Sequence, residues 1–178
     1  FTRMMLLGSL LLVAGVLLLL LGRPVFVAVW TFIAFFVLTI AAERLELSRL
    51  SPTPRWAGLL LGILSYVPAA SACARALGSE TASRWLGVSL ALVGCWQLSF
   101  DLARRTVRLP GLPRFAAFGV LLGAGWLVVA GVLCTALELP VAGPAYDAVL
   151  HAVLVGYVLS MVFAHAPIIF PAVARVRL

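Results

Sequence analysis

The stretch AYDAVLHAVLVGYVLSMVFAHAPIIFPAV, from Ala145 to Val173, decides the fold of this sequence. A transmembrane α-helix needs about 20 predominantly apolar residues, and this run exceeds that length with Asp147 as its one acidic residue. The same run holds both histidines of the chain, His151 and His165. The sequence therefore predicts a membrane-spanning helix that carries two imidazoles.

The spacing of the two histidines places them on one face of a regular helix. Fourteen positions at about 100° each give roughly 1400°, about 40° short of four full turns. At about 1.5 Å per residue, the histidines lie roughly 21 Å apart along the axis, so they fall in opposite halves of a bilayer about 30 Å thick. Imidazoles are rare inside hydrocarbon, and this pair therefore indicates a functional site.

The composition excludes a water-soluble globule. Of the 178 residues, 64% are hydrophobic and only 11% are charged, which leaves too little polar surface to cover a soluble protein. The net charge of +7 does not indicate nucleic-acid binding, because the basic residues, all arginine, are scattered through short connections. We therefore expect an integral membrane protein that has the lipid bilayer as its first partner.

Six apolar runs predict an all-α, up-and-down bundle of six transmembrane helices in a single domain over residues 1–178. The runs cover residues 4–21, 24–42, 56–77, 85–100, 115–139 and 145–173. The first run is long for a signal peptide and has no clear small-residue cleavage site, so we favour a retained helix. The chain begins at Phe1 and ends at Leu178 without a polar tail, so we expect it to be a fragment of a longer chain.

The distribution of arginine predicts the orientation of the bundle. The side with both termini and the second-to-third and fourth-to-fifth connections carries ten arginines, namely Arg3, Arg44, Arg49, Arg55, Arg104, Arg105, Arg108, Arg114, Arg175 and Arg177. The opposite side carries three, namely Arg23, Arg75 and Arg84. Because positive charge stays in the cytoplasm, we expect both termini there, with His165 toward the inner face and His151 toward the outer face.

Prolines and small residues predict where the helices bend and pack. Pro68 should kink the third helix, and the AASACA cluster at 69–74 should pack closely against a neighbour. In the fifth helix, Gly119, Gly123 and Gly125 include a G-x-x-x-G spacing that indicates helix packing.

Two further segments have a predicted local structure. Pro167 and Pro171 should distort the inner end of the last helix and expose backbone carbonyls, with His165 as a candidate partner for one of them. Residues 43–55 predict a solvated turn in which Glu46 pairs with Arg49. A docking edge for a partner or a ligand propionate is the alternative for that turn.

The histidines are candidate cofactor and metal ligands. Neutral imidazole binds haem iron, copper or a chlorin magnesium, and Met161, one turn before His165, could add a thioether to the same site. Two haems with two imidazoles each need four histidines, so further ligands would come from another subunit, from sequence beyond Leu178 or from another residue type. The alternative is that each imidazole satisfies a polar group on a neighbouring helix and that Met161 only packs.

The sequence contains few other residues that could bind a metal or transfer a proton. Glu138 and Asp147 could form a proton-access or metal-entry site with His151, or they could simply mark helix ends. Cys73 and Cys134 could meet in a disulfide or a metal contact, with small buried thiols as the alternative, and Cys95 has no pairing or metal-ligand spacing. Signatures of hydrolases and phosphoryl-transfer enzymes are missing from the sequence.

The segment HAVLVGYVLSMVFAHAPIIFPAV, residues 151–173, carries a family resemblance. Its His-Ala-x-x-x-Gly start and Ser-Met step resemble part of the NnrS-type bacterial membrane proteins, many-helix proteins associated with haem, copper and nitric oxide stress. It also resembles uncharacterised bacterial membrane proteins with an H-A-P-I-I-x-P-A-V ending. The resemblance covers 23 of the 178 residues and implies a haem- or metal-binding protein of the bacterial inner membrane, with His151 and His165 as ligands.

Three functions are therefore open. The first is haem or metal binding through the last helix, for electron transfer across the membrane or small-gas chemistry. The second is a cofactor-free accessory subunit of a larger respiratory or photosynthetic complex, with other membrane subunits or a second copy of the chain as partners. The third is a proton-coupled transporter in which His165 relays protons along a path lined by broken helices.

Overall fold

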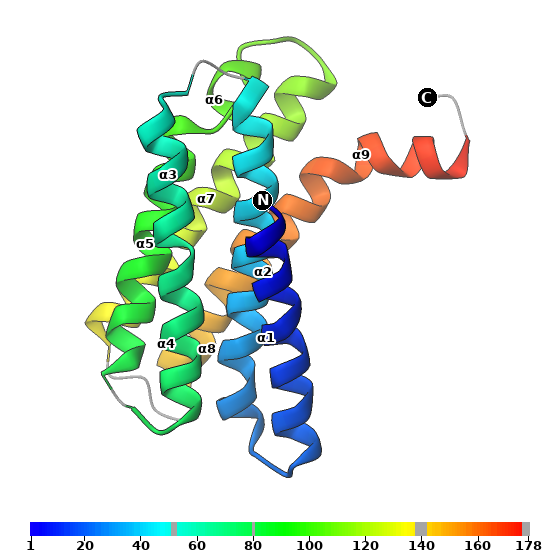
Figure 1. Ribbon diagram of the computed structural model, residues 1–178. Coiled ribbons are helices and arrows are strands. Elements are labelled where there is room, and N and C mark those ends of the chain that lie inside the picture. Colours follow the sequence, from blue (N-terminus) through cyan, green and yellow to red (C-terminus); the bar gives the residue numbers. More distant parts are fainter. Residues whose placement is uncertain (51–52, 80, 138–141, 176–178) are drawn as a thin grey trace.

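The computed structural model describes residues 1–50, 53–79, 81–137 and 142–175, and within these ranges the chain is helical apart from short connections and contains no strand (Figure 1). The all-α prediction is confirmed. The predicted apolar runs all form helices, in the order α1 (Thr2–Leu20), α2 (Val25–Leu47), η1 (Ser48–Leu50), α3 (Arg55–Leu64), α4 (Tyr66–Ala76), α5 (Ala82–Phe100), α6 (Ala103–Thr106), α7 (Leu112–Ala136), α8 (Pro144–His151), η2 (Ala152–Leu159) and α9 (Ser160–Ala174).

Five helical stretches in the described part of the chain are long and apolar enough to cross a membrane. They are Thr2–Leu20, Val25–Leu50, Arg55–Ala76, Leu112–Ala136 and Pro144–Pro171. The chain is therefore a multi-pass membrane protein by length and composition. Helix α5 is outside this group, because polar residues such as Arg84, Ser89 and Gln97 lower its hydropathy.

The third helix is interrupted at Ser65, where α3 ends and α4 begins, close to the kink predicted from Pro68. Pro68 has no N–H to donate to the carbonyl of Leu64, one turn earlier, so the α-helical hydrogen-bond pattern is interrupted there. The hydroxyl of Ser65 donates to the carbonyl of Leu61 at 2.7 Å and satisfies one group at the break. Ala69 and Ala72 in the cluster after the break are buried.

Glycines allow α7 to approach two neighbours closely. A Cβ added at Gly119 would lie 2.8 Å from Cβ of Ala164, and one added at Gly123 would lie 3.2 Å from Cβ of Ser160, both on α9. The packing role of this G-x-x-x-G pair is confirmed. Gly125 has nothing within 4 Å of an added Cβ and takes no part in the contact. On the other side of α7, Gly94 of α5 would bring an added Cβ to 2.9 Å from the carbonyl oxygen of Ala124.

The last run is not a uniform α-helix. Residues Ala152–Leu159 form η2, a π-helical segment between α8 and α9. After η2, α9 leaves the bundle at an angle and carries Pro167 and Pro171 in its interior (Figure 1). Apolar side chains on the part of α9 that leaves the bundle, such as Ile169 and Phe170, are exposed. The bundle and the departing helix together form the grooves described below.

Candidate functional site

The site begins with a buried arginine at the end of α2. This helix continues to Leu47, beyond the predicted end at Ala42, and its buried stripe runs through Val37, Ala41 and Arg44 at helical spacing. Arg44 is therefore only 5% exposed. The prediction of a solvated turn over residues 43–55 is wrong for this arginine, because the helical register carries it into the interior. The predicted Glu46–Arg49 pair is confirmed at 3.0 Å.

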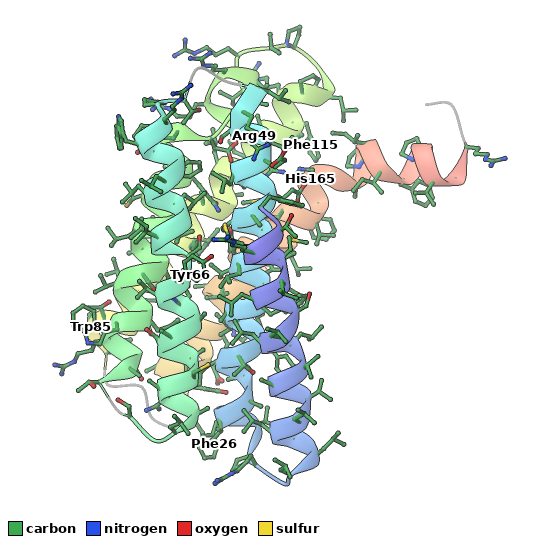
Figure 2. All side chains as sticks on the ribbon, viewed as in Figure 1. Phe26, Arg49, Tyr66, Trp85, Phe115 and His165 are labelled. Atoms are coloured by element: carbon green, nitrogen blue, oxygen red, sulfur yellow. The ribbon has the colours of Figure 1, made fainter. Side chains whose placement is uncertain are left out.

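Arg44 contacts a histidine of α9 and a carboxylate of its own helix. Its Nη2 lies 3.0 Å from Nε2 of His165 and 3.1 Å from Oε1 of Glu43. Figure 2 shows His165 at the place where α9 leaves the bundle, beside α2. The contact joins residues 121 positions apart in the chain, so it ties α9 to α2. An ionisable pair of this kind inside an apolar protein is a functional-site hypothesis by default.

Hydrogen-bond chemistry fixes the tautomer of His165. Its Nδ1 lies 2.7 Å from the carbonyl oxygen of Met161, and a carbonyl only accepts, so Nδ1 carries the proton. A guanidinium only donates, so Nε2 accepts the hydrogen bond from Arg44. The imidazole is therefore held in the neutral Nδ1–H form, with the Nε2 lone pair directed at Arg44.

Helix α5 brings two more buried polar residues to this end of the bundle. Asp101, at the end of α5, is 3% exposed, and its Oδ1 accepts the N–H of Ala103 at 2.8 Å. One turn deeper, Gln97 is fully buried and its Nε2 donates to the hydroxyl of Tyr157 at 2.8 Å. In the described part of the chain, Nε of Arg44, Oδ2 of Asp101 and Oε1 of Gln97 are buried without a hydrogen-bond partner.

Arg44 and His165 line two grooves. A groove of about 570 Å³ lies between α2 and the last helix, with a mostly apolar lining formed by Phe36, Ile40, Val158, Val162, Ile169 and Phe170 in addition to the pair. A groove of about 380 Å³ adjoins α6 and α7 and also contains Asp101. The Arg44–His165 contact therefore lies where the two grooves meet, with the carboxylates of Glu43 and Asp101 nearby and mostly apolar side chains around them.

The electrostatics of the site are set by burial. Burial raises the pKa of the Asp101 carboxyl above its ordinary value of 3.8, while the Ala103 N–H and the charge of Arg44 act to lower it. In the described residues no ion pair within 4 Å joins Arg44 to Asp101, and Glu43 is the carboxylate that contacts the guanidinium. A buried arginine with an unpaired Nε retains the capacity to donate to a further acceptor oxygen.

His151 lies elsewhere and is not brought together with His165. Its side chain is exposed, and its Nδ1 is 2.7 Å from the carbonyl oxygen of Asp147, so it has the same local hydrogen bond as His165. The 40° offset expected for a continuous α-helix does not apply, because the π-helical segment η2 between them has wider turns. Asp147 thus contacts His151 through its backbone, and Glu138 lies outside the described residues.

Met161 contacts the ring of His165 through its backbone carbonyl and not through its sulfur. Its carbonyl accepts the Nδ1–H bond, and its side chain is 5% exposed, with Cε 3.5 Å from the position of an added Cβ at Gly123 of α7. The thioether is therefore packed toward α7. Met161 nonetheless lines the larger groove, next to the histidine.

The cysteines are free thiols. Cys73 and Cys95 are exposed, whereas Cys134 is buried and its thiol donates to the carbonyl of Ser83 at 3.2 Å. Cys73 and Cys134 therefore form no disulfide in this structure. Among the described residues, histidine, cysteine, aspartate and glutamate nowhere form a group of three that could hold a metal ion.

Sequence reasoning missed Arg44, Asp101 and Gln97. A signal existed for Arg44, because extension of the buried stripe of α2 by one turn reaches it. Gln97 and Asp101 are four residues apart on α5, a spacing that places both on one helix face. Nothing in the sequence showed that this face meets Tyr157 and the groove beside His165.

The chain belongs to a family described only as a domain of unknown function, DUF8744, which matches residues 1–178. No curated protein and no solved structure matches the sequence significantly.

Proposed function

We propose that this chain is a bacterial inner-membrane protein that binds haem, or another metal cofactor such as copper or a chlorin, through His165 in the groove between α2 and α9. The role of the cofactor would be electron transfer or small-gas chemistry. One observation carries the proposal, namely an imidazole with its Nδ1 proton held by a carbonyl at the polar end of an apolar groove of about 570 Å³. Histidines that ligate metals typically donate the other ring N–H in this way.

The surroundings of His165 fit a macrocycle with acidic substituents. Aromatic and aliphatic side chains such as Phe36 and Ile40 line the groove, and apolar walls suit a porphyrin or chlorin ring. Arg44 is buried and its Nε has no partner, so it could donate to a propionate carboxylate. In that arrangement Nε2 of His165 would ligate the metal and Arg44 would exchange its histidine contact for a carboxylate contact.

His151 is the candidate ligand of a second centre. Its Nδ1 is held by the carbonyl of Asp147, so Nε2 is the atom available for ligation, and its exposed position would suit a cofactor shared with a neighbouring subunit or a second copy. Each centre would take one imidazole from this chain. A partner chain or further sequence would supply any second axial ligand, and Met161 would act by holding His165.

We also infer six membrane spans with both termini in the cytoplasm. Helix α5 has 19 residues, a length of about 28 Å as an α-helix, which is sufficient to cross a bilayer core of about 30 Å. Its buried face carries small and polar residues, such as Gly87, Ser89 and Gly94, because it packs closely within the bundle. The excess of arginine on the side of the α2–α3 and α5–α7 connections supports the orientation.

The cofactor proposal is tested by spectroscopy and metal analysis. The wild-type protein is expressed with a supply of haem precursor and purified in detergent, and its absorption spectrum and content of iron, copper and magnesium are measured. We expect a bound pigment or metal that is lost in His165→Ala. Met161→Leu should retain it, because the backbone carbonyl that holds His165 is unchanged.

The same preparation distinguishes the competing functions. Wild-type protein without pigment or bound metal would contradict the cofactor proposal and favour the accessory subunit. The unpaired buried atoms of Arg44, Asp101 and Gln97 favour a second candidate, proton-coupled transport with His165 as a relay. A proton flux in proteoliposomes that disappears in His165→Ala, in protein without pigment, would support that second function.

A further inference from the structure

A separate pocket at the same end of the bundle is strongly basic. It has a volume of about 260 Å³ and is lined by Thr53, Pro54, Ser99, Phe100, Asp101, Arg104, Arg105 and Arg108. The three arginines fall within five positions of the sequence, on the short helix α6 and in the turn that directly follows it. Thus three arginines line one small volume.

Within the described residues, none of these arginines forms an ion pair with a neighbouring carboxylate. In the described part of the chain, the only ion pairs within 4 Å are Arg44–Glu43 and Arg49–Glu46, and neither involves the pocket. Arg104 donates to the carbonyl of Ser99 at 2.6 Å, which fixes one guanidinium at the rim. Asp101 is the one carboxylate in the lining, and its Oδ1 is bound to the N–H of Ala103. The pocket therefore has a surplus of positive charge and of hydrogen-bond donors.

Aromatic side chains place this pocket at the depth of the lipid head groups. Phe100, which lines the pocket, packs edge-on against Trp56 with ring centroids 5.3 Å apart, and it also contacts Trp96 at 5.9 Å. The indole N–H of Trp96 donates to the carbonyl of Ala57 at 2.7 Å and holds α5 against α3. Tryptophan residues concentrate at the membrane–water interface, and Trp56 is 57% exposed, as expected for an interfacial residue.

We propose that the pocket formed by Arg104, Arg105 and Arg108 binds the phosphate group of an anionic membrane lipid. Guanidinium groups bind phosphate through paired N–H donors, and Thr53 can add a hydroxyl donor. Trp56, which contacts Phe100 of the pocket, and Leu59, about one turn further along α3, are exposed and offer an apolar surface for the acyl chains. A bound lipid of this kind would connect the start of α3 with the end of α5, and it does not depend on any cofactor at His165.

The test counts lipids bound to the purified protein by native mass spectrometry. The probes are phosphatidylglycerol and phosphatidylcholine, titrated separately into wild-type protein, into the double variant Arg105→Gln/Arg108→Gln, and into Arg114→Gln. Arg114 is a matched control because it is an exposed arginine at the same end of the bundle that does not line the pocket. An arginine near an anionic lipid surface contributes about fivefold in affinity, so the double variant should bind phosphatidylglycerol about 25-fold more weakly.

The expected pattern is preferential phosphatidylglycerol binding by wild-type protein and Arg114→Gln, and its loss in the double variant. A loss per removed arginine in Arg114→Gln as large as that in the double variant, about fivefold each, would overturn the proposal, because general surface charge would then explain the binding. Inorganic phosphate is added in a separate arm. If it displaces phosphatidylglycerol at equal concentration, the lipid assignment is overturned, since the acyl chains would then contribute nothing. Melting temperatures of all variants, measured without added lipid, verify that each is folded.

Discussion

At the scale of single residues, the site depends on how Arg44 and His165 satisfy each other. A guanidinium with 5% exposure needs acceptors, and Nε2 of His165 and Oε1 of Glu43 supply two of them. The sequence could identify His165 as unusual, because a histidine in an apolar run is rare. It could not identify its partner, because a contact across 121 positions depends on how α9 lies against α2.

The first prediction concerns the coupling between these two side chains. His165→Leu leaves a buried guanidinium short of an acceptor, whereas Arg44→Met leaves a neutral imidazole, so the histidine substitution should destabilise the protein more. In a double-mutant cycle measured by denaturant or thermal unfolding in detergent, we expect a coupling free energy of about 1.5–3 kcal/mol.

A matched control is the exposed pair Glu46–Arg49, whose side chains are 43% and 70% exposed. Its coupling free energy should be about 0–1 kcal/mol, because solvent screens an exposed pair. Additive effects of the two substitutions at Arg44 and His165 would contradict the proposed mutual dependence.

The second prediction concerns the pH dependence of stability at Asp101. Because burial raises the pKa of this carboxyl in the folded protein, the folded state binds the proton more tightly than the unfolded chain. Stability from this group is therefore present at low pH and is lost as the pH rises from 3.8 through the raised value. Asp101→Asn keeps an Oδ1 acceptor for the N–H of Ala103 but does not titrate.

The measurement compares melting temperatures of wild-type protein and Asp101→Asn in detergent over a series of pH values. The melting temperature of Asp101→Asn should rise relative to that of the wild-type protein as the pH rises above 3.8. If the difference in melting temperature between wild type and Asp101→Asn were the same at every pH, the Asp101 carboxyl would have the same pKa in the folded and unfolded states.

At the scale of elements, the helices could be predicted from the sequence, but only some of their irregularities could. Pro68 indicates the break between α3 and α4, and the G-x-x-x-G pair indicates a contact of α7. The π-helical segment η2 has no comparable signal, since residues Ala152–Leu159 are apolar and fit an ordinary α-helix. Its wider turns remove the shared face predicted for the two histidines. Gly87 and Gly94, seven positions apart on α5, were an available signal for the contact of α5 with α7.

The third prediction compares two glycines that differ in their surroundings. Gly94→Ala places a methyl group 2.8 Å from Cγ2 of Val128 and 2.9 Å from the carbonyl oxygen of Ala124, so α5 and α7 must separate. We expect a loss of about 1–3 kcal/mol in the free energy of unfolding, typical of overpacking. Gly125→Ala is the control, because nothing lies within 4 Å and alanine favours the helix.

Thermal unfolding in detergent measures both variants. Gly94→Ala should melt at a lower temperature than wild type, and Gly125→Ala should melt at the same or a slightly higher temperature. If both variants behaved alike, the close approach of α5 and α7 would not be a feature of the protein in solution.

At the scale of the whole molecule, the composition and charge of the sequence predict the class of protein, whereas the contacts between its helices could not be predicted in this way. The hydrophobic content identifies a membrane protein, and five of the apolar helices in the described part of the chain are long enough to span. The arginine-bearing end of the bundle also holds Arg44, Asp101 and His165 and the basic pocket beside α6. The candidate cofactor groove and the candidate lipid site therefore lie near the same membrane surface. The sequence predicted that Arg44, Arg104 and His165 share this end, but it did not show that the grooves and the basic pocket adjoin, because that depends on where α9 and the end of α5 meet.

The last prediction tests the topology, and in particular whether α5 crosses the membrane. In a background in which Cys73, Cys95 and Cys134 are replaced by alanine, Leu77→Cys and Arg108→Cys place single thiols in the two connections that flank α5. Both sites are exposed, Leu77 at 89%. If both termini are cytoplasmic, a membrane-impermeant maleimide should label Leu77→Cys in intact spheroplasts and Arg108→Cys only after permeabilisation. Labelling of both sites from the same side would mean that α5 does not span, because a single crossing must separate its two ends. A reversed pattern would mean that α5 spans in the opposite orientation. The arginine-rich end would then face outward, although positive charge is usually retained in the cytoplasm.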